Sequence, residues 1–308
     1  MPIDQHPDPR ATPLRRLLAQ REGLAPEMVL VGNGAVDLIY QLVTAFVRPG
    51  DTVLTLAPTF GEYAAAATMM GANVIAHQTR AEQGFQPDLD QLIEQVQQSR
   101  PRICFLCNPN NPTGVYLPRD SIAALLNACP KTLLVLDEAF VNFAADPWPA
   151  RELLPAGNLA ILRSLTKDYA LTALRAGYVL APPLVIDALA KVQPPWSVNA
   201  LAQAAALVAL EDEQHLVTSM VALAQARTSL VRQLVTRGLH PLDSAVHFFL
   251  LPVPSANAWA QQLRQHGIIV RDGTSFGLPM HIRIAPRHAE ANARLVHQLA
   301  AQLSLKPT

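Results

Sequence analysis

The sequence has 308 residues, and its 24 lysines and arginines balance 24 aspartates and glutamates. A neutral chain without a basic stripe gives no reason to expect nucleic acid or an anionic membrane as a partner. Half of the residues are hydrophobic, which indicates a globular protein with a buried core and excludes an intrinsically disordered one.

Three cysteines are too few for a disulfide framework, so a reducing, cytoplasmic location is expected. Cys104 and Cys107 form a C-x-x-C, but residues three apart on a strand face opposite sides, so we expect both to pack in the core. The nine histidines show no metal-ligand spacing, and no metal site is predicted. No stretch reaches the roughly 18 uncharged apolar residues of a transmembrane helix, and the polar, proline-rich start does not resemble a signal peptide.

Short apolar runs alternate with segments of helical periodicity along the first two thirds of the chain. The predicted strands are 26–31, 53–56, 73–76, 103–107, 132–136, 159–162 and 177–180. The predicted helices between them are 35–46, 63–70, 89–98 and 119–127. Strands that are apolar on both faces and alternate with helices predict an α/β fold with a mainly parallel, seven-stranded sheet covered on both sides.

A long helical stretch at 211–236 leaves this region. It is followed by predicted strands at 246–251, 268–270 and 280–284 and a helix at 259–266. We therefore expect a large domain at 26–212 and a smaller α+β C-terminal domain at 213–308, with an N-terminal segment at 1–25.

Polar and aromatic residues follow five of the predicted strands. These segments are 32–35, 58–60, 108–111, 137–140 and 164–167. Ligands of open parallel sheets bind at the carboxyl ends of the strands, so the five segments are expected to share one site.

The residue types in these segments suit particular chemistry. Gly34 and Ala35 lie between a strand and a helix, where backbone N–H groups can bind an anion. Asp137 is costly to bury without a cationic partner, and a protonated pyridine nitrogen is such a partner. Lys167 can form a Schiff base with an aldehyde, and the fork of Arg175 suits a phosphate. Taken singly, each feature has an ordinary alternative: a tight turn, a helix cap or a solvated side chain.

Taken in order, these features resemble the fold-type-I pyridoxal-phosphate (PLP) enzymes. The combination of Asn111-Pro112-Thr113-Gly114, Ser164-x-x-Lys167 and Arg175 is similar to the class I/II aminotransferase superfamily, in its histidinol-phosphate aminotransferase branch. The resemblance covers nearly the whole chain, from about Pro7 to Leu299. It implies the fold-type-I architecture and PLP as the cofactor.

The resemblance implies a role for each residue of the site. Lys167 carries the cofactor as a Schiff base and moves protons, and Asp137 keeps the pyridine nitrogen protonated so that the ring acts as an electron sink. The implied contacts to the ring and phosphate are Asn111 at the ring hydroxyl, Phe60 on the ring face, and Gly34, Ala35, Ser164 and Arg175 around the phosphate. The implied substrate contacts are Arg283 for a carboxylate, and Arg271 and Arg287 either for a phosphate or as ordinary surface arginines.

The resemblance does not distinguish between two reactions and a protein with impaired catalysis. Phe140 and Thr166 stand where the aminotransferases usually have Tyr and Ser, and 194–199 is similar to L-threonine-O-3-phosphate decarboxylase of the cobalamin pathway. That decarboxylase is the first expectation. The alternatives are a histidinol-phosphate or other class I/II aminotransferase, and a shortened PLP-binding protein with impaired catalysis. The bond to Cα that lies perpendicular to the ring plane is the one that breaks, and no sequence feature measures that angle.

The start of the chain departs from the family pattern. His6-Pro7-Asp8-Pro9 stands where the family has Tyr-Pro-Asp-Pro, and the arm that precedes it in relatives is expected to be missing. Either the start is mis-assigned or the chain is a shortened member. His6 replaces the tyrosine that reaches the neighbouring subunit's cofactor phosphate. Family members are homodimers, so a second copy and a small amino-acid substrate are the expected partners.

Overall fold

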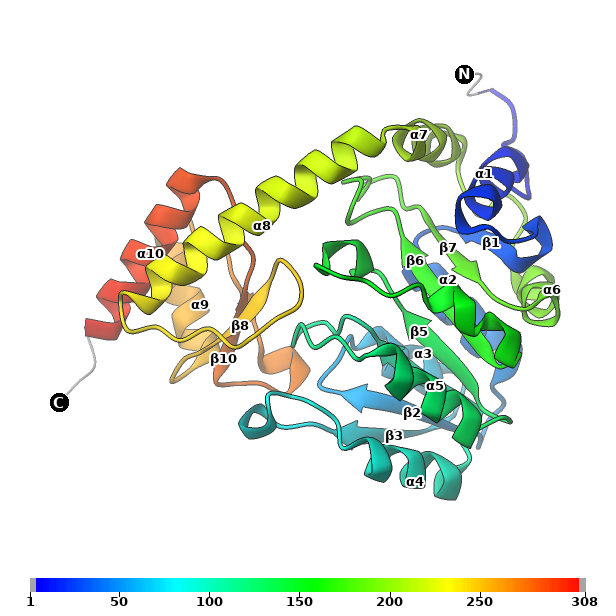
Figure 1. Cartoon of the computed structure of the whole chain (residues 1–308), viewed down its shortest axis with the longest axis horizontal. Helices are drawn as coiled ribbons and strands as arrows, with labels where there is room; N and C mark the ends of the chain where they lie inside the picture. Colours follow the sequence, from blue (N-terminus) through cyan, green and yellow to red (C-terminus); the bar gives the residue numbers. More distant parts are fainter. Residues whose placement is uncertain (1–3, 305–308) are drawn as a thin grey trace.

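The computed structural model describes residues 4–304 and centres on a seven-stranded sheet (Figure 1). Its strands are β1 (Val29–Gly32), β2 (Thr52–Ala57), β3 (Asn73–Gln78), β4 (Ile103–Cys107), β5 (Leu133–Asp137), β6 (Leu159–Ser164) and β7 (Gly177–Leu180). They lie in the order β1-β7-β6-β5-β4-β2-β3. Strands β2 to β6 pair in parallel, and β7 is antiparallel to both of its neighbours. The predicted fold class and its mainly parallel, seven-stranded sheet are confirmed.

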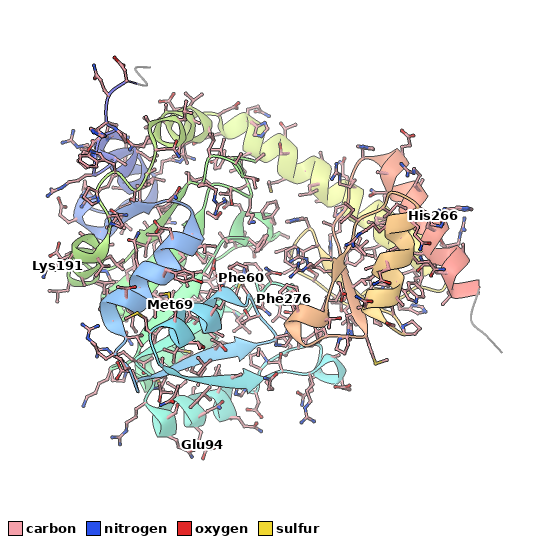
Figure 2. All side chains as sticks on the ribbon, turned by 180° about the vertical axis from the view of Figure 1, so that it is seen from behind. Phe60, Met69, Glu94, Lys191, His266 and Phe276 are labelled. Carbon is pink, nitrogen blue, oxygen red and sulfur yellow. The ribbon has the colours of Figure 1, made fainter. Side chains whose placement is uncertain are left out.

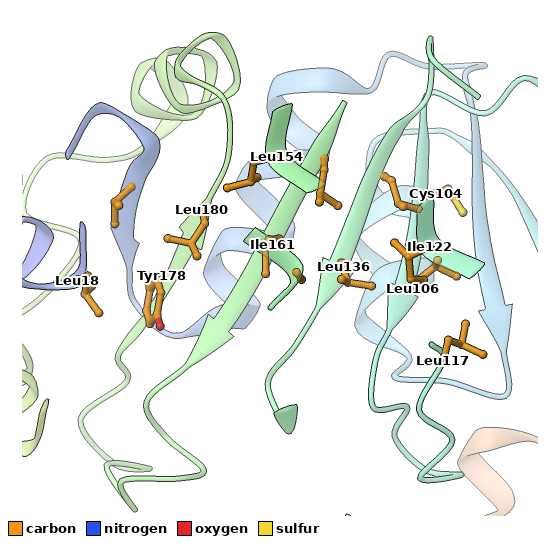
Figure 3. Packing of buried hydrophobic residues seen from close by; sticks show 14 of the residues in the cluster. Leu18, Cys104, Leu106, Leu117, Ile122, Leu136, Leu154, Ile161, Tyr178 and Leu180 are labelled. Atoms are coloured by element: carbon orange, nitrogen blue, oxygen red, sulfur yellow. The ribbon is translucent and has the colours of Figure 1, made fainter. Parts of the chain in front are cut away.

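Helices cover both faces of this sheet. The helices of the first face are α1 (Thr12–Glu22), α4 (Leu89–Ser99), α5 (Arg119–Ala128) and α7 (Ala200–Glu211), and those of the second are α2 (Ala35–Phe46), α3 (Glu62–Met69) and α6 (Pro183–Val192). Figure 3 shows part of the first core, where Leu106, Leu136, Ile161 and Leu180 of neighbouring strands lie on the same face. Alternation along β4 sends Cys104 to the first core and Cys107 to the second, as predicted.

The long predicted helix at 211–236 corresponds to a single helix that begins after Asp212. The Asp212 carboxylate accepts the N–H of His215 at 2.9 Å and so begins α8 (Glu213–Val235) where α7 ends. In Figure 1, α8 runs diagonally from the large sheet to the C-terminal region. The predicted domain boundary coincides with this cap, and the division into domains remains a prediction. Within residues 4–304 no helix is both long and apolar enough to cross a membrane.

The C-terminal region has a sheet and a core of its own. Its elements are β8 (Phe249–Pro252), α9 (Ala256–Gln265), β9 (Arg271–Asp272), β10 (His281–Ile284) and α10 (Ala289–Ser304). The strand order is β8-β10-β9, and both pairings are antiparallel. Short 3-10 helices complete the fold: η1 (Pro26–Met28), η2 (Ala81–Gln83), η3 (Val141–Phe143), η4 (Ala150–Ala156) and η5 (Thr274–Phe276).

The predicted strand at 268–270 is wrong. Pairing with β10 begins only at Arg271, and Ile269 is 83% exposed, so the apolar run there does not enter the sheet. Seen from behind, Phe60 and Phe276 mark the border between the two sheets (Figure 2). The candidate site lies on the large-sheet side of this border.

Leu136→Ala tests the first core. Leu136 is fully buried on β5, and its truncation leaves a cavity, so we expect a loss of about 2–5 kcal/mol in unfolding free energy. Leu184→Ala is the matched control because Leu184 is 84% exposed, and its loss is expected within about 0.5 kcal/mol. Chemical denaturation measures both, and equal losses would contradict the described packing.

Candidate active site

A pocket opens at the carboxyl ends of the central strands. Its lining residues are Ala35, Val36, Ile39, Phe60, Tyr63, Cys107, Asn111, Asp137, Ala139, Phe140, Ser164, Thr166, Lys167 and Arg175. Every residue predicted to contact the cofactor is in this lining except Gly34, which directly precedes Ala35. The five strand-end segments thus converge, because the ends of parallel strands meet at one edge of the sheet.

Asp137 forms the floor of the pocket. It is only 4% exposed, and its two carboxylate oxygens accept hydrogen bonds from the Tyr63 hydroxyl at 2.6 Å and the Ala139 N–H at 2.9 Å. Burial raises the pKa of Asp137, while these two donors and the Lys167 amine oppose the rise. A buried carboxylate of this kind needs a cation in the pocket, and a protonated pyridine nitrogen fits that need.

Tyr63 is a site residue that the sequence analysis missed. Its side chain is fully buried on α3, and its ring stacks on Phe105 with centroids 4.9 Å apart. Burial and the nearby Asp137 carboxylate raise the pKa of the phenol, so Tyr63 stays a hydrogen-bond donor. The available signal was a tyrosine on the buried side of a helix rich in alanine, since a buried hydroxyl requires a partner.

The other end of the pocket is arranged for an anion. Gly34 has φ +83°, and a Cβ at this position would lie 2.7 Å from Nη2 of Arg175. A Cβ at Gly177 would lie 2.7 Å from the backbone nitrogen of Ala35, so the turn packs directly on β7. No side chain caps the start of α2 at Gly34, which leaves N–H groups of its first turn open to a ligand. These N–H groups and the guanidinium of Arg175 fit the phosphate of PLP.

Ser164 and Thr166 border the same end of the pocket. Their hydroxyl oxygens lie 2.7 Å apart, and the Thr166 N–H donates to the Ser164 hydroxyl at 3.3 Å. Both side chains are buried. Thr166 therefore fixes the rotamer of Ser164, a role that its position before the lysine did not reveal.

Lys167 lies on the turn after β6 and reaches the pocket, with Nζ 5.8 Å from the centroid of the Phe140 ring. Partial burial lowers the pKa of Lys167, and the positive charges of Arg175 and Arg283 lower it further, against the opposing effect of Asp137. A lowered pKa increases the fraction of free amine at neutral pH, which is the form that reacts with an aldehyde.

Arg283 brings the C-terminal sheet to the pocket. Its Nη1 donates to Oδ1 of Asn111, and its guanidinium carbon lies 4.9 Å from the centroid of the Phe248 ring. Burial and the charge of Arg271 lower the pKa of Arg283 to about 10, so it stays positively charged at neutral pH.

The two other predicted substrate arginines occupy different places. Arg271 faces Arg283 across the β9–β10 pairing and donates to the Ser275 hydroxyl at 2.8 Å. Arg287 is exposed, and the hydrogen bonds described for it are those of its backbone with Asn292. None of the three arginines is among the pocket-lining residues. Arg283 contacts the lining through Asn111, and Arg271 lies beside Arg283.

His247 is a second residue that the sequence analysis missed. Its ring lies 4.2 Å from the ring of Phe143 and 6.0 Å from that of Phe140. Burial and the charges of Arg283, Lys167 and Arg227 lower its pKa to about 4, so the imidazole is neutral at neutral pH. Among the described residues, its Nδ1 has no hydrogen-bond partner. The sequence places His247 only inside a predicted strand.

Comparison with known proteins gives consistent matches over nearly the whole chain. The family model for aminotransferase class I and II matches residues 3–300. Histidinol-phosphate aminotransferase 2 of Carboxydothermus hydrogenoformans is 32% identical over 98% of this chain and 84% of its own length. The histidinol-phosphate aminotransferase of Symbiobacterium thermophilum is 35% identical, over 98% of this chain and 83% of its own.

Solved structures agree with these matches. Histidinol-phosphate aminotransferase from Sinorhizobium meliloti in complex with pyridoxal-5'-phosphate has a TM-score of 0.89 and 27% identity, covering 97% of this chain and 84% of that one. L-threonine-O-3-phosphate decarboxylase from Porphyromonas gingivalis has a TM-score of 0.86 and 28% identity, covering 98% and 91%.

Tyr63→Phe removes one donor to Asp137 and keeps the stacked ring. Loss of this hydrogen bond makes the carboxylate less stable, so we expect the affinity for PLP to fall by up to about tenfold. Absorbance titration of the cofactor-free protein with PLP measures the change. Tyr40→Phe is the control, since the Tyr40 hydroxyl bonds Glu62 and lies outside the pocket lining. Equal affinities for Tyr63→Phe and the unchanged protein would contradict the assigned role.

His247→Asn tests the buried imidazole through the pH dependence of stability. The pKa of about 4 lies below the ordinary 6.5, so neutral His247 adds stability above pH 6.5 that is lost as the pH falls towards 4. The variant is expected to lack this part of the pH dependence, about 3 kcal/mol at most. Denaturation curves from pH 4 to 7 measure it, with exposed His266→Asn as the control. Parallel curves for variant and unchanged protein would refute the assignment.

Proposed function

The chain belongs to the class I and II aminotransferase family and is a PLP-dependent enzyme, and we propose that it is a histidinol-phosphate aminotransferase. The observation that carries the proposal is the agreement of two curated relatives of that name, at 32% and 35% identity over 98% of the chain. The pocket supports it, because Lys167 and Asp137 lie together in the arrangement that PLP requires.

The first expectation, threonine-phosphate decarboxylation, is less well supported than its aminotransferase alternative. The sequence relatives are named as aminotransferases, while the decarboxylase is a structural neighbour at 28% identity. Phe140 and Thr166, which favoured the decarboxylase, do line the pocket. They keep it as the second candidate. The pocket gives no support to the third alternative, a PLP-binding protein with impaired catalysis, because both Lys167 and Asp137 line it.

The residues of the large sheet divide the work between binding and proton transfer. When bound, PLP supplies an electron sink for the bond that breaks at Cα. Asp137 would hold the proton of the pyridine nitrogen, and the α2 N-terminus with Arg175 would hold the phosphate. Lys167 would supply the amine that binds the cofactor and would then move a proton to and from the substrate carbon. The lowered pKa of Lys167 suits both tasks.

Arg283 and Arg271 are the proposed anchors for the anionic group of the substrate. They face each other on adjacent strands, and Arg283 already reaches the pocket through Asn111. Two neighbouring guanidinium groups suit a phosphate, which offers several acceptor oxygens. Arg287 lies outside this pair, and its predicted contact with the substrate has less support.

We also infer a homodimer, as the family resemblance implies. Several exposed apolar side chains lie along two consecutive helices: Leu201 and Val208 on α7, and Val217 and Val221 on α8. His6, the counterpart of the tyrosine that reaches a partner's phosphate in relatives, stacks on Trp196 of its own chain with centroids 4.4 Å apart. Its role across a subunit interface remains a prediction.

A turnover assay tests the proposed function. The holoenzyme is incubated with histidinol phosphate and a keto acid such as 2-oxoglutarate, and glutamate formation that needs both substrates is the expected result. Lys167→Ala is expected to lower turnover at least about a thousandfold and to abolish fixation of the cofactor by borohydride. Exposed Lys191→Ala is the control. Release of CO₂ from threonine phosphate without a keto acid would contradict the proposal and support the decarboxylase.

A further inference from the structure

The turn that carries Lys167 belongs to neither a helix nor a strand. On its N-terminal side, the Leu165 N–H donates to the Ala176 carbonyl at 3.1 Å, and the Thr172 hydroxyl donates to the Thr166 carbonyl at 3.0 Å. These bonds tie the turn to its own loop. A lysine that must reach two reacting atoms needs a further restraint from a rigid neighbour.

Two cavities lie at the strand ends on opposite faces of the sheet. The cofactor pocket is lined by Asp137, Ser164 and Lys167, and a second, polar cavity is lined by their neighbours Glu138, Arg163 and Asp168, with Ser164 lining both. The second cavity lies in the first core, beneath α1 and α7. Asp137 and Lys167 are therefore each followed in the chain by a residue that lines the second cavity.

An ion pair connects two residues of the second cavity. Oε2 of Glu138 lies 2.8 Å from Nη2 of Arg163, and the Glu138 side chain is fully buried. Burial raises the pKa of Glu138 to about 7, and Arg163 opposes the rise. Removal of either partner leaves an uncompensated buried charge, so substitutions here report on folding rather than on the position of the lysine.

A third residue of the second cavity, Asp168, has a contact that can be tested separately. Nδ2 of Asn142 donates to its Oδ2 at 2.6 Å, and the Tyr169 N–H donates to its Oδ1 at 3.0 Å. Asp168 is 8% exposed, and burial raises its pKa to about 6, so it is ionised at pH 7 and above. Asn142 lies on η3, five residues after Asp137 and two after Phe140, which lines the pocket.

We propose that the Asn142–Asp168 hydrogen bond positions Lys167, because it ties the turn of the lysine to the turn that follows Asp137. Asp137 and Lys167 act on opposite parts of the same cofactor, so their relative placement decides whether the amine meets the substrate carbon. Asn142 and Asp168 are not among the residues that line the cofactor pocket, so they would act through Lys167. The proposal rests on PLP binding in this pocket and not on the identity of the amino substrate.

The test compares Asp168→Ala, Asn142→Ala, their double variant and Asp168→Asn as holoenzymes. Asp168→Asn keeps an oxygen that can accept from Asn142, so it serves as the conservative variant. The first readout needs no substrate: it is the midpoint of the pH titration of the visible absorbance of bound PLP. Both alanine variants are expected to shift the midpoint by about half a pH unit or more. The double variant is expected to shift it no further than either single variant does. Asp168→Asn is expected to shift it little.

The second readout is turnover with the amino substrate that the unchanged enzyme accepts. The alanine variants are expected to lower kcat about 10- to 100-fold with KM changed less than about threefold, because misplacement of the lysine affects reaction more than binding. Arg119→Ala, which removes a partner of the surface pair with Glu152, is the control and should change neither readout.

A purely structural role predicts a different pattern and would overturn the proposal. The alanine variants would then lower the unfolding free energy while the absorbance midpoint and kcat stay unchanged. Shifts of the two single variants that add in the double variant would overturn it as well, since a shared bond can be lost only once. Failure of the histidinol-phosphate assay leaves the absorbance titration valid, so the two proposals fail separately.

Discussion

A buried carboxylate without a cation of its own organises this pocket. Asp137 ends β5 in the middle of the sheet, where only 4% of its surface meets solvent. Its oxygens are satisfied by Tyr63 and Ala139, but within residues 4–304 no cationic side chain forms an ion pair with it. A negative charge buried in this way is unfavourable unless a cationic ligand neutralises it. The remaining residues of the pocket surround the space that such a ligand would occupy.

The sheet explains how residues far apart in the chain serve one cofactor. Because the side chains of a strand alternate, each strand end offers one residue to the pocket and the next to the opposite core. Glu138, Arg163 and Asp168 line the cavity on the opposite side, and the proposed restraint on Lys167 acts from there. Rigidity of a site on loops therefore comes from contacts that the ligand never touches.

Most of the fold and of the cofactor pocket could be predicted from the sequence, because apolar strand periodicity and strand-end polarity are local signals. The five converging segments follow from the parallel sheet alone. Tyr63 was missed because its partner Asp137 is 74 residues away, and helical periodicity does not show where a hydroxyl points. The neutrality of His247 depends on packing between two sheets and on three cations from different segments. The strand at 268–270 was overpredicted because apolar residues there, such as Ile269, remain on the surface.

The hydrogen bond between Arg283 and Asn111 links the C-terminal sheet to the cofactor pocket. In this bond the amide oxygen of Asn111 occupies a donor of the Arg283 guanidinium that an anion could otherwise bind. Under the proposed role of Arg283, a substrate anion would replace this neutral amide, and the exchange favours a doubly charged phosphate over a weakly charged or poorly placed anion. Because the contact exists before any substrate arrives, the proposed anchor would already discriminate in favour of strongly anionic groups.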